Sequence, residues 1–184
     1  MVPRIGGFNK PVALAYTTAM ANFSFDIVSD YDKAEMNNVI EQAKKELGSR
    51  YDLKGTQADL DWLNPEKTGL KITGDNDYHI DAILDIVRKK LATRNQSQKV
   101  LDVTNENTVS NLKTTKEVPF RKGLSSENAK KISATIREHY PKVKPQIQGE
   151  EVRVTSPKKD ELQAVMQLLK QQDFDFPLDF TNFR

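Results

Sequence analysis

The chain has 184 residues, 37% of them apolar and 29% charged, with a formal net charge of +2 at pH 7 and no cysteine. The lack of cysteine excludes disulfides, thiolate nucleophiles and thiolate metal sites, and it fits a reducing compartment. The charge is far below the basic excess of a dedicated duplex-DNA binder, and no segment approaches the ~20 apolar residues that a membrane-spanning helix needs. We therefore expect a folded cytoplasmic protein that does not enter a membrane.

Residues 1–21 differ in character from the rest of the chain. They contain two prolines, two glycines and no acidic residue, and their apolar run at 12–16 is short. The Ala-x-Ala-like ending is compatible with a secretory or organellar signal, but the run is too short and Pro11 interrupts its start. The pattern favours a disordered extension, or a start assigned upstream of Met20.

The first half of the chain predicts a strand, a helix, a hairpin, a second helix and a last strand. Alternation of apolar and polar residues marks the strands, and apolar residues spaced three and four apart mark the helices. Asp30 or Asp32 can cap the first helix, and Asp75 or Asn76 can cap the second. In chain order the expected elements are 23–29, 33–47, 58–62 paired with 70–73, 80–88 and 99–103.

A polar stretch, 104–116, follows and is expected to be a linker. The second half then repeats the order of strand, helix, hairpin, helix and strand. Ser125 or Ser126 can cap its first helix, and Ser156 followed by Pro157 can cap its second. The expected elements are 117–122, 127–139, a hairpin over 146–154 with a Gly-Glu turn, 162–170 and 176–180.

The two halves form an internal repeat. Segment 70–88 aligns without a gap with 152–170, so that Ile72 falls on Val154. Two amphipathic helices can match by chance, but this match also runs through a strand and a loop. Each half reads β-α-β-β-α-β, which is the ferredoxin-like pattern. The expected fold class is therefore α+β, with two ferredoxin-like βαββαβ domains in tandem.

The polar stretch sets the expected domain boundaries. The first domain would comprise 22–103, the linker 104–116 and the second domain 117–184. An exchange of terminal strands between the halves stays open, because a sequence does not reveal which sheet a strand joins.

In such a half, both helices cover one face of the sheet and leave the other face open. On the second half, alternation places Lys144, Gln146, Gln148 and Arg153 on the open face. Arg153 falls on Lys71 in the repeat, so each sheet would carry a cation at the same place. Lys and Arg can donate to phosphate, Arg to guanine O6 and N7, and Gln to base edges. A solvated or interdomain polar face is the alternative for each of these residues.

Two aromatic residues are candidates for stacking on nucleobases. Tyr51 follows Arg50, and Phe183 precedes the basic residue Arg184. The other alternating phenylalanines are expected in the core, and the aromatic signature of the RNA-recognition module is missing from the sequence. The analogy with that module is therefore one of fold only.

Catalytic and metal-binding patterns are missing from the sequence. The two histidines, His79 and His139, lie near the ends of different predicted helices, which favours structural roles over metal binding. Neither the GxxxxGK[ST] nor the GxGxxG phosphate-binding motif is found. We therefore expect no enzyme activity and no cofactor.

Five segments together resemble the YajQ family. They are FDIVS at 25–29, SRYD at 49–52, IQGEEVRV at 147–154, DELQAVM at 160–166 and FTNFR at 180–184. The resemblance runs from about Asn22 to the last residue and excludes residues 1–21. It implies two ferredoxin-like domains that bind nucleotides or nucleic acid. Some members of the family are taken to be receptors for cyclic di-GMP with links to transcriptional control, and others are discussed as RNA or tRNA binders.

The resemblance carries no motif that fixes ligand contacts, so the candidate site rests on physical inference. We expect a monomeric protein that binds cyclic di-GMP, another nucleotide or a short RNA through the open sheet face or a groove between the halves. The alternative is an interaction module that docks a transcription or translation factor, with incidental RNA or tRNA binding. The candidate residues are Arg50, Tyr51, Lys71, Lys144, Gln146, Gln148, Arg153, Phe183 and Arg184.

Overall fold

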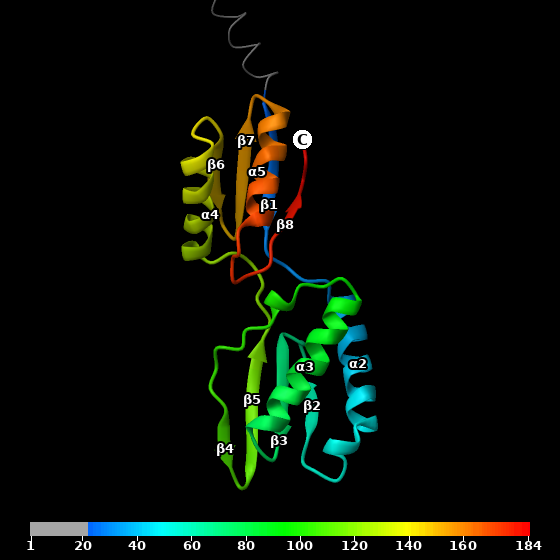
Figure 1. The fold of residues 1–184 in the computed structure, drawn as a ribbon. Helices are drawn as coiled ribbons and strands as arrows, with labels where there is room; N and C mark the ends of the chain where they lie inside the picture. Colours follow the sequence, from blue (N-terminus) through cyan, green and yellow to red (C-terminus); the bar gives the residue numbers. More distant parts are fainter. Residues whose placement is uncertain (1–21) are drawn as a thin grey trace, which may run out of the picture. The chain divides into compact units, whose positions relative to one another are not determined.

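The computed structural model describes residues 22–184, which form two compact units. Unit 1 consists of the described residues up to Ser29 together with Gly123–Phe174 and Leu178–Arg184. Unit 2 consists of Asp30–Lys122 and Asp175–Pro177. Each unit is described by itself (Figure 1). The extension predicted for residues 1–21 lies outside the described residues.

Unit 1 contains a four-stranded antiparallel sheet, here named sheet A, with the strand order β6-β7-β1-β8. The helices α4 and α5 pack on the same face of it (Figure 1). In chain order the unit reads β-α-β-β-α-β, as the ferredoxin-like pattern predicts. The elements are β1 (Phe23–Val28), α4 (Ser126–His139), β6 (Lys144–Gln148), β7 (Glu151–Ser156), α5 (Lys159–Gln171) and β8 (Asp179–Thr181).

Unit 2 contains a second four-stranded antiparallel sheet, sheet B, with the order β2-β3-β5-β4. Here α2 and α3 pack together and against the sheet (Figure 1). Two short 3-10 helices, η1 and η2, complete the unit. The elements are α2 (Lys33–Ser49), η1 (Tyr51–Leu53), β2 (Asp59–Trp62), β3 (Gly69–Gly74), α3 (Asp77–Thr93), η2 (Gln98–Val100), β4 (Thr108–Ser110) and β5 (Lys113–Pro119).

The two halves exchange their first strands. β1 was expected to begin the first domain, but it lies between β7 and β8 in sheet A. β5 overlaps the strand expected to begin the second domain, but it lies between β3 and β4 in sheet B. The structure thus contains the two predicted ferredoxin-like arrangements, with unit 2 inserted in unit 1 after β1.

This exchange corrects the expected domain boundaries. The division into 22–103 and 117–184 is not that of the structure, because the first strand of each range pairs with the other unit's strands. The stretch 104–116 is not merely a linker, since it contains β4 and the beginning of β5. Its polar composition misled the prediction because β4 is an edge strand whose three residues are all exposed.

The strand predicted at 99–103 is also wrong. Residues Gln98–Val100 form η2, and a single antiparallel bridge joins Leu101 to Phe120. Val100 and Leu101 are buried in the core of unit 2, which accounts for their apolar character without a strand.

Side-chain caps begin three of the four helices as predicted. Asp32, Asn76 and Ser125 are N-cap residues, and each accepts a hydrogen bond from the backbone N–H three residues further on. The prediction for α5 is wrong, because its N-cap is Lys158 and has no side-chain hydrogen bond. Ser156 instead accepts from the N–H of Lys158 just outside the helix.

Each unit has its own core between its helices and its sheet. In unit 1, Phe25, Val152 and Val154 are fully buried on the helix-covered side of sheet A. In unit 2, Ile72 and Ile83 belong to one cluster of buried residues. Among residues 22–184, no helix has the length and apolar character required to span a membrane.

Candidate functional site

The open face of sheet A is the side that α4 and α5 do not cover. Across this face Gln146 pairs with Arg153, Arg153 with Asp26, and Asp26 with Thr181. Directly opposed residues of antiparallel strands point to the same side, so these four side chains form one row. The register also places the four predicted residues of β6 and β7 on this face, namely Lys144, Gln146, Gln148 and Arg153.

An ion pair lies at the centre of the row. The Nε of Arg153 donates to Oδ1 of Asp26 at 2.9 Å, and Nη2 donates to Oδ2 at 3.2 Å. Asp26 is 4% exposed, whereas Arg153 is half-buried. The carboxylate therefore binds the guanidinium group at two points from within the sheet, and it fixes the plane of the guanidinium group.

The end of the chain adds a third hydrogen bond to Asp26. Asn182 has a positive φ of 57°, and its Nδ2 donates to Oδ2 of Asp26 at 2.9 Å. Thr181 pairs with Asp26 and Arg184 with Ser24, so two residues of this segment lie opposite Phe25 alone. This extra residue is a β-bulge, and it turns the Asn182 amide toward the open face.

The bulge separates the two candidate residues at the chain end. Phe183 stacks on Phe25 with ring centroids 6.0 Å apart, and Phe25 is buried on the helix-covered side. Arg184 exchanges both backbone hydrogen bonds with Ser24, which places its side chain on the open face. The structure therefore brings Arg184, but not Phe183, to the face that carries Arg153.

The ion pair changes the acidity of its members. The hydrogen bond from Arg153 is the main cause that lowers the pKa of Asp26, Asn182 contributes in the same direction, and desolvation by burial opposes them. The hydrogen bond to Asp26 likewise raises the pKa of Arg153. Both groups are therefore charged near neutral pH.

The remaining charges divide the open face of sheet A into two ends. Lys144 and Arg184 lie in the row at one end, on opposite edges of the sheet. Glu151 and Asp179 lie in the row at the other end. Among residues 22–184, Lys144 forms no salt bridge. One end of the face is therefore suited to an anionic group.

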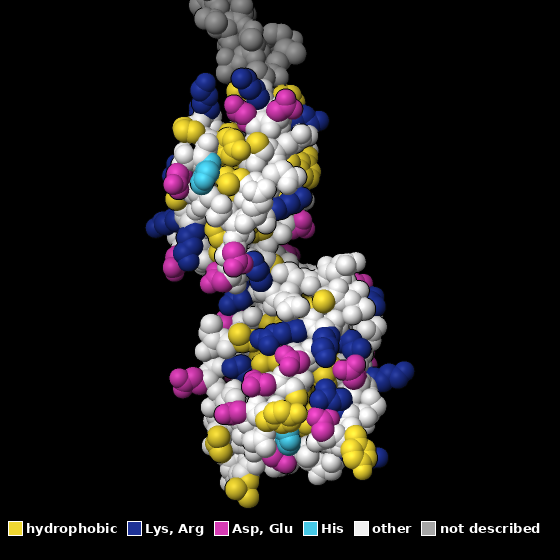
Figure 2. All heavy atoms as spheres, viewed as in Figure 1, with side chains coloured by type: hydrophobic (Ala, Val, Ile, Leu, Met, Phe, Trp, Pro, Cys, Tyr) yellow, Lys and Arg dark blue, Asp and Glu magenta, His cyan; other side chains and the backbone are white. Residues whose placement is uncertain are grey.

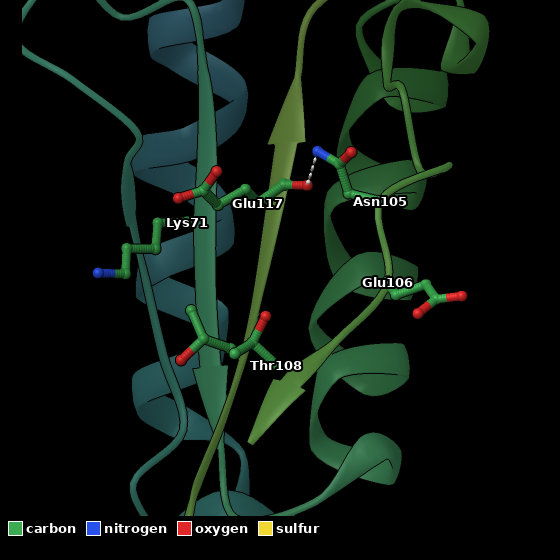
Figure 3. Close-up of a pocket in the computed structure, with 6 residues that line it drawn as sticks. Lys71, Asn105, Glu106, Thr108 and Glu117 are labelled. Carbon is green, nitrogen blue, oxygen red and sulfur yellow. Dashed lines mark hydrogen bonds between the residues drawn. The ribbon is translucent and has the colours of Figure 1, made fainter. Parts of the chain in front are cut away.

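The open face of sheet B has a different charge pattern. Lys71 is exposed on β3, between its cross-strand partners Asp61 and Glu117. A hollow of about 460 Å³ lies beside it, and Figure 3 shows that it opens on the side away from the helices. Its lining residues are Lys71, Asn105, Glu106, Thr108, Thr115 and Glu117. The surroundings of this lysine are thus acidic.

Arg50 lies between α2 and η1 in unit 2, and Tyr51 is the first residue of η1. The Nε and Nη2 of Arg50 both donate to the carboxylate of Asp52 at 2.8 Å, and this contact lowers the pKa of Asp52. Tyr51 is 91% exposed. The structure therefore divides the candidates: Arg50, Tyr51 and Lys71 belong to unit 2, and the other six belong to unit 1.

The helix-bearing side of unit 2 does not concentrate positive charge. Figure 2 views the unit from the side of α3 and shows Lys and Arg side chains interspersed with Asp and Glu. Several of them form ion pairs, including Arg94 with Glu35 at 2.6 Å and Lys90 with Glu46 at 3.2 Å.

The histidines have structural contacts. The Nδ1 of His79 accepts a hydrogen bond from the N–H of Asp75, and Nδ1 of His139 lies 3.0 Å from the carbonyl oxygen of Thr135. In the described part of the chain, no group of three or more His, Asp or Glu side chains is arranged to hold a metal ion.

Sequence reasoning missed two members of this site, Asp26 and Asn182. The alternation of Asp26 with Phe25 and Ile27 indicated a polar face for Asp26. The sequence did not indicate burial, which depends on β1 lying between β7 and β8. No pattern in the sequence marked the bulge at Asn182.

Two ferredoxin-like units, one inserted in the other, with open sheet faces that carry arginine and lysine, define the structural class of the protein. The sequence model of the family described as "Nucleotide-binding protein YajQ-like" matches residues 23–184. The chain belongs to this family, which confirms the resemblance seen in the sequence.

Three relatives are each named "Nucleotide-binding protein". The one from Nocardioides sp. is 45% identical over 166 residues, which cover 90% of this chain and 100% of the relative. The one from Trichodesmium erythraeum is 45% identical over 161 residues, with 88% and 97% covered. The one from Thermobifida fusca is 44% identical over 165 residues, with 89% and 99% covered. The similarity thus extends over nearly the whole length of each relative.

Proposed function

We propose that this protein binds a nucleotide on the open face of sheet A, and that cyclic di-GMP is the first ligand to test. The observation that carries the proposal is Arg153, which the buried Asp26 holds at the centre of this face. Lys144 and Arg184 lie toward one end of the same face. The names of the family and of the similar proteins support nucleotides as the class of ligand.

The side chains on this face match the chemistry of a guanine nucleotide. Lys144 and Arg184 can neutralise phosphate oxygens, and an arginine can also donate to guanine O6 and N7 as a pair. Gln146 lies opposite Arg153 and can donate to or accept from a base edge. We therefore expect the phosphates at the end of the open face that carries Lys144, and a base near the row that contains Gln146 and Arg153.

The charge pattern favours sheet A over sheet B as the binding face. Lys71 holds the equivalent place in the repeat, but Asp61 and Glu117 flank it across the strands. Carboxylates on both sides repel a phosphate, and they offset the attraction of the single lysine.

A single nucleotide is favoured over a stacked RNA strand. RNA-recognition sheets stack successive bases on aromatic side chains of the open face. On the described strands of sheet A, the residues of the open face include no aromatic residue, and Phe183 lies on the opposite side with Phe25. The stacking contacts that stabilise RNA on such sheets are therefore missing from this face.

Isothermal titration with cyclic di-GMP tests the proposal. Lys144→Gln should weaken binding by roughly 10- to 100-fold, because a hydrogen bond to a charged group contributes about 1.5–3 kcal/mol. Lys71→Gln is the matched control, since it removes the same charge from the open face of sheet B. Full binding by Lys144→Gln with loss in Lys71→Gln would move the site to sheet B. A parent protein that binds neither cyclic di-GMP nor GMP would overturn the proposal.

Docking of a transcription or translation factor is the second candidate function. Tyr51 is 91% exposed and Leu112 is 87% exposed, both in unit 2. Tyrosine is enriched among the residues that anchor protein contacts. A tagged chain should then retain a stoichiometric partner that Tyr51→Ser loses, whereas Lys144→Gln should keep it. Retention of the same partner by Tyr51→Ser and Leu112→Ser would remove this candidate.

A further inference from the structure

The guanidinium group of Arg153 has two edges that can each donate two parallel hydrogen bonds. The edge formed by Nε and Nη2 is bound to Asp26. The other edge, formed by Nη1 and the second N–H of Nη2, has no hydrogen-bond acceptor among residues 22–184. Arg153 is thus attached to the sheet by one edge, and its other edge is free to donate.

Asp26 is itself fixed in place. It is 4% exposed on a central strand, and Asn182 donates to the same Oδ2 atom that accepts from Nη2 of Arg153. A carboxylate with three hydrogen bonds in a buried position has one orientation, and it transmits that orientation to the guanidinium group. A flexible arginine would instead lose side-chain entropy each time that it bound a ligand.

We propose that Asp26 is a positioning residue for nucleotide binding, which directs the free edge of Arg153 toward two adjacent acceptor atoms of the ligand. Asn182 supports Asp26 in this role. The inference rests on the proposed function and concerns which atoms of the ligand the same site recognises. Two acceptor atoms side by side occur in a phosphodiester group and on the O6/N7 edge of guanine, and both suit this edge.

The variant Asp26→Asn removes this role with little change in shape. An asparagine offers one acceptor oxygen, but Nη2 of Arg153 and Nδ2 of Asn182 both donate to one atom of Asp26 while Nε donates to the other. At least one N–H group then faces an NH₂ group, and the guanidinium loses its fixed plane. A second variant, Asn182→Ala, leaves both contacts between Arg153 and Asp26 in place and removes only the hydrogen bond that Asn182 donates to Asp26.

The binding experiment uses the full chain with cyclic di-GMP and cyclic di-AMP as probes. Asp26→Asn should weaken binding roughly tenfold, and Asn182→Ala by less, because each loses part of a charge-assisted contact. An equal loss for both probes assigns the free edge to phosphate, and a loss confined to cyclic di-GMP assigns it to guanine. The Arg153 Nε–H signal in NMR should exchange faster with water in Asp26→Asn.

Two comparisons separate this role from a general loss of stability. Ile132 lies on the buried face of α4, and Ile132→Val should lower the melting temperature without weakening binding. Arg153→Lys combined with Asp26→Asn should bind no more weakly than Arg153→Lys alone, because Asp26 acts through the arginine. Unchanged affinity in both Asp26→Asn and Asn182→Ala, with Lys144→Gln still impaired, overturns the positioning role and leaves the proposed function intact. If Asp26→Asn does not fold, unchanged affinity of Asn182→Ala together with an unchanged Nε–H signal overturns it.

Discussion

Asp26 is the only carboxylate among residues 22–184 that is buried. Burial alone would favour its neutral form, but Arg153 and Asn182 stabilise the charged form through three hydrogen bonds. The hydrogen bonds outweigh the desolvation, since the net effect lowers the pKa of Asp26. The same carboxylate thus links the stability of sheet A to the order of its open face.

The lowered pKa of Asp26 predicts a defined loss of stability in acid. A carboxyl group with a lower pKa in the folded state stabilises the fold above its unfolded pKa, which is about 3.9, and this stabilisation is lost as the pH falls through the folded value. In urea titrations, the unfolding free energy of the parent should therefore fall more steeply below about pH 4 than that of Asp26→Asn. Asp81→Asn, which removes an exposed carboxylate of α3, serves as the control. Parallel curves for the parent and Asp26→Asn would contradict the prediction.

An added methyl group should have opposite effects on stability at two glycines of unit 2. A Cβ atom on Gly74 would overlap the Cβ of His79 in the first turn of α3, so Gly74→Ala should destabilise the protein by about 1–3 kcal/mol. A Cβ on Gly48 meets nothing within 4 Å in the last turn of α2, and Gly48→Ala should stabilise it by about 0.5–1 kcal/mol. Urea denaturation measures both changes. A neutral result for Gly74→Ala would mean that α3 shifts at little cost.

At the scale of elements, local patterns predicted most helices and hairpins but not the partners of the strands. The caps at Asp32, Asn76 and Ser125 follow from residues adjacent in the sequence. The sheet that β1 or β5 joins depends on pairing with strands that lie many residues away in the sequence. Either strand could serve as the first strand of either ferredoxin-like sheet. Alternation of side chains describes the faces of a strand and carries no information about its neighbour.

The same distinction explains how much of the site could be predicted. Lys144, Gln146, Gln148 and Arg153 were placed on one face because a single hairpin fixes their register. The contact of Arg153 with Asp26 joins residues that are far apart in the sequence, so neither the composition nor the periodicity of apolar residues indicated it.

The turn between β4 and β5 contains a strained position. Asn111 and Leu112 have positive φ values of 52° and 63°, a conformation that suits Asn-Gly in a two-residue hairpin. Leu112 is exposed, and its backbone carbonyl accepts a hydrogen bond from Nε2 of Gln57. Leu112→Gly should stabilise unit 2 by about 0.5–1 kcal/mol. The left-handed backbone conformation costs a residue with a Cβ atom about 1–2 kcal/mol, and removal of this cost outweighs the entropy that glycine adds to the unfolded chain.

Leu112→Ala separates the backbone effect from the side chain. Alanine keeps the Cβ atom that causes the strain, so its unfolding free energy should stay near that of the parent. Thermal melts of the three proteins compare these values directly. Equal stabilisation by glycine and alanine would assign the gain to removal of the exposed leucine side chain instead.

At the scale of the whole molecule, one unit interrupts the other. The N–H of Gly123 donates to the carbonyl of Ser29, so the chain leaves unit 1 and returns to it at two hydrogen-bonded residues. An insertion of this kind keeps β1 beside β7 in sheet A. Each unit has its own sheet, helices and buried apolar residues, as independent domains do.

This organisation predicts that the two units lose structure separately. Ile83 lies in the core of unit 2 and Leu169 in that of unit 1, and each is 1% exposed. Replacement of either by alanine should cost about 2–5 kcal/mol in its own unit. Hydrogen exchange in Ile83→Ala should therefore accelerate for amides of α3 and β3 and stay unchanged for those of α5 and β7, and Leu169→Ala should give the reverse. If both variants accelerated exchange equally in all four elements, the units would unfold as one cooperative body, and a ligand on sheet A would then stabilise sheet B to the same extent.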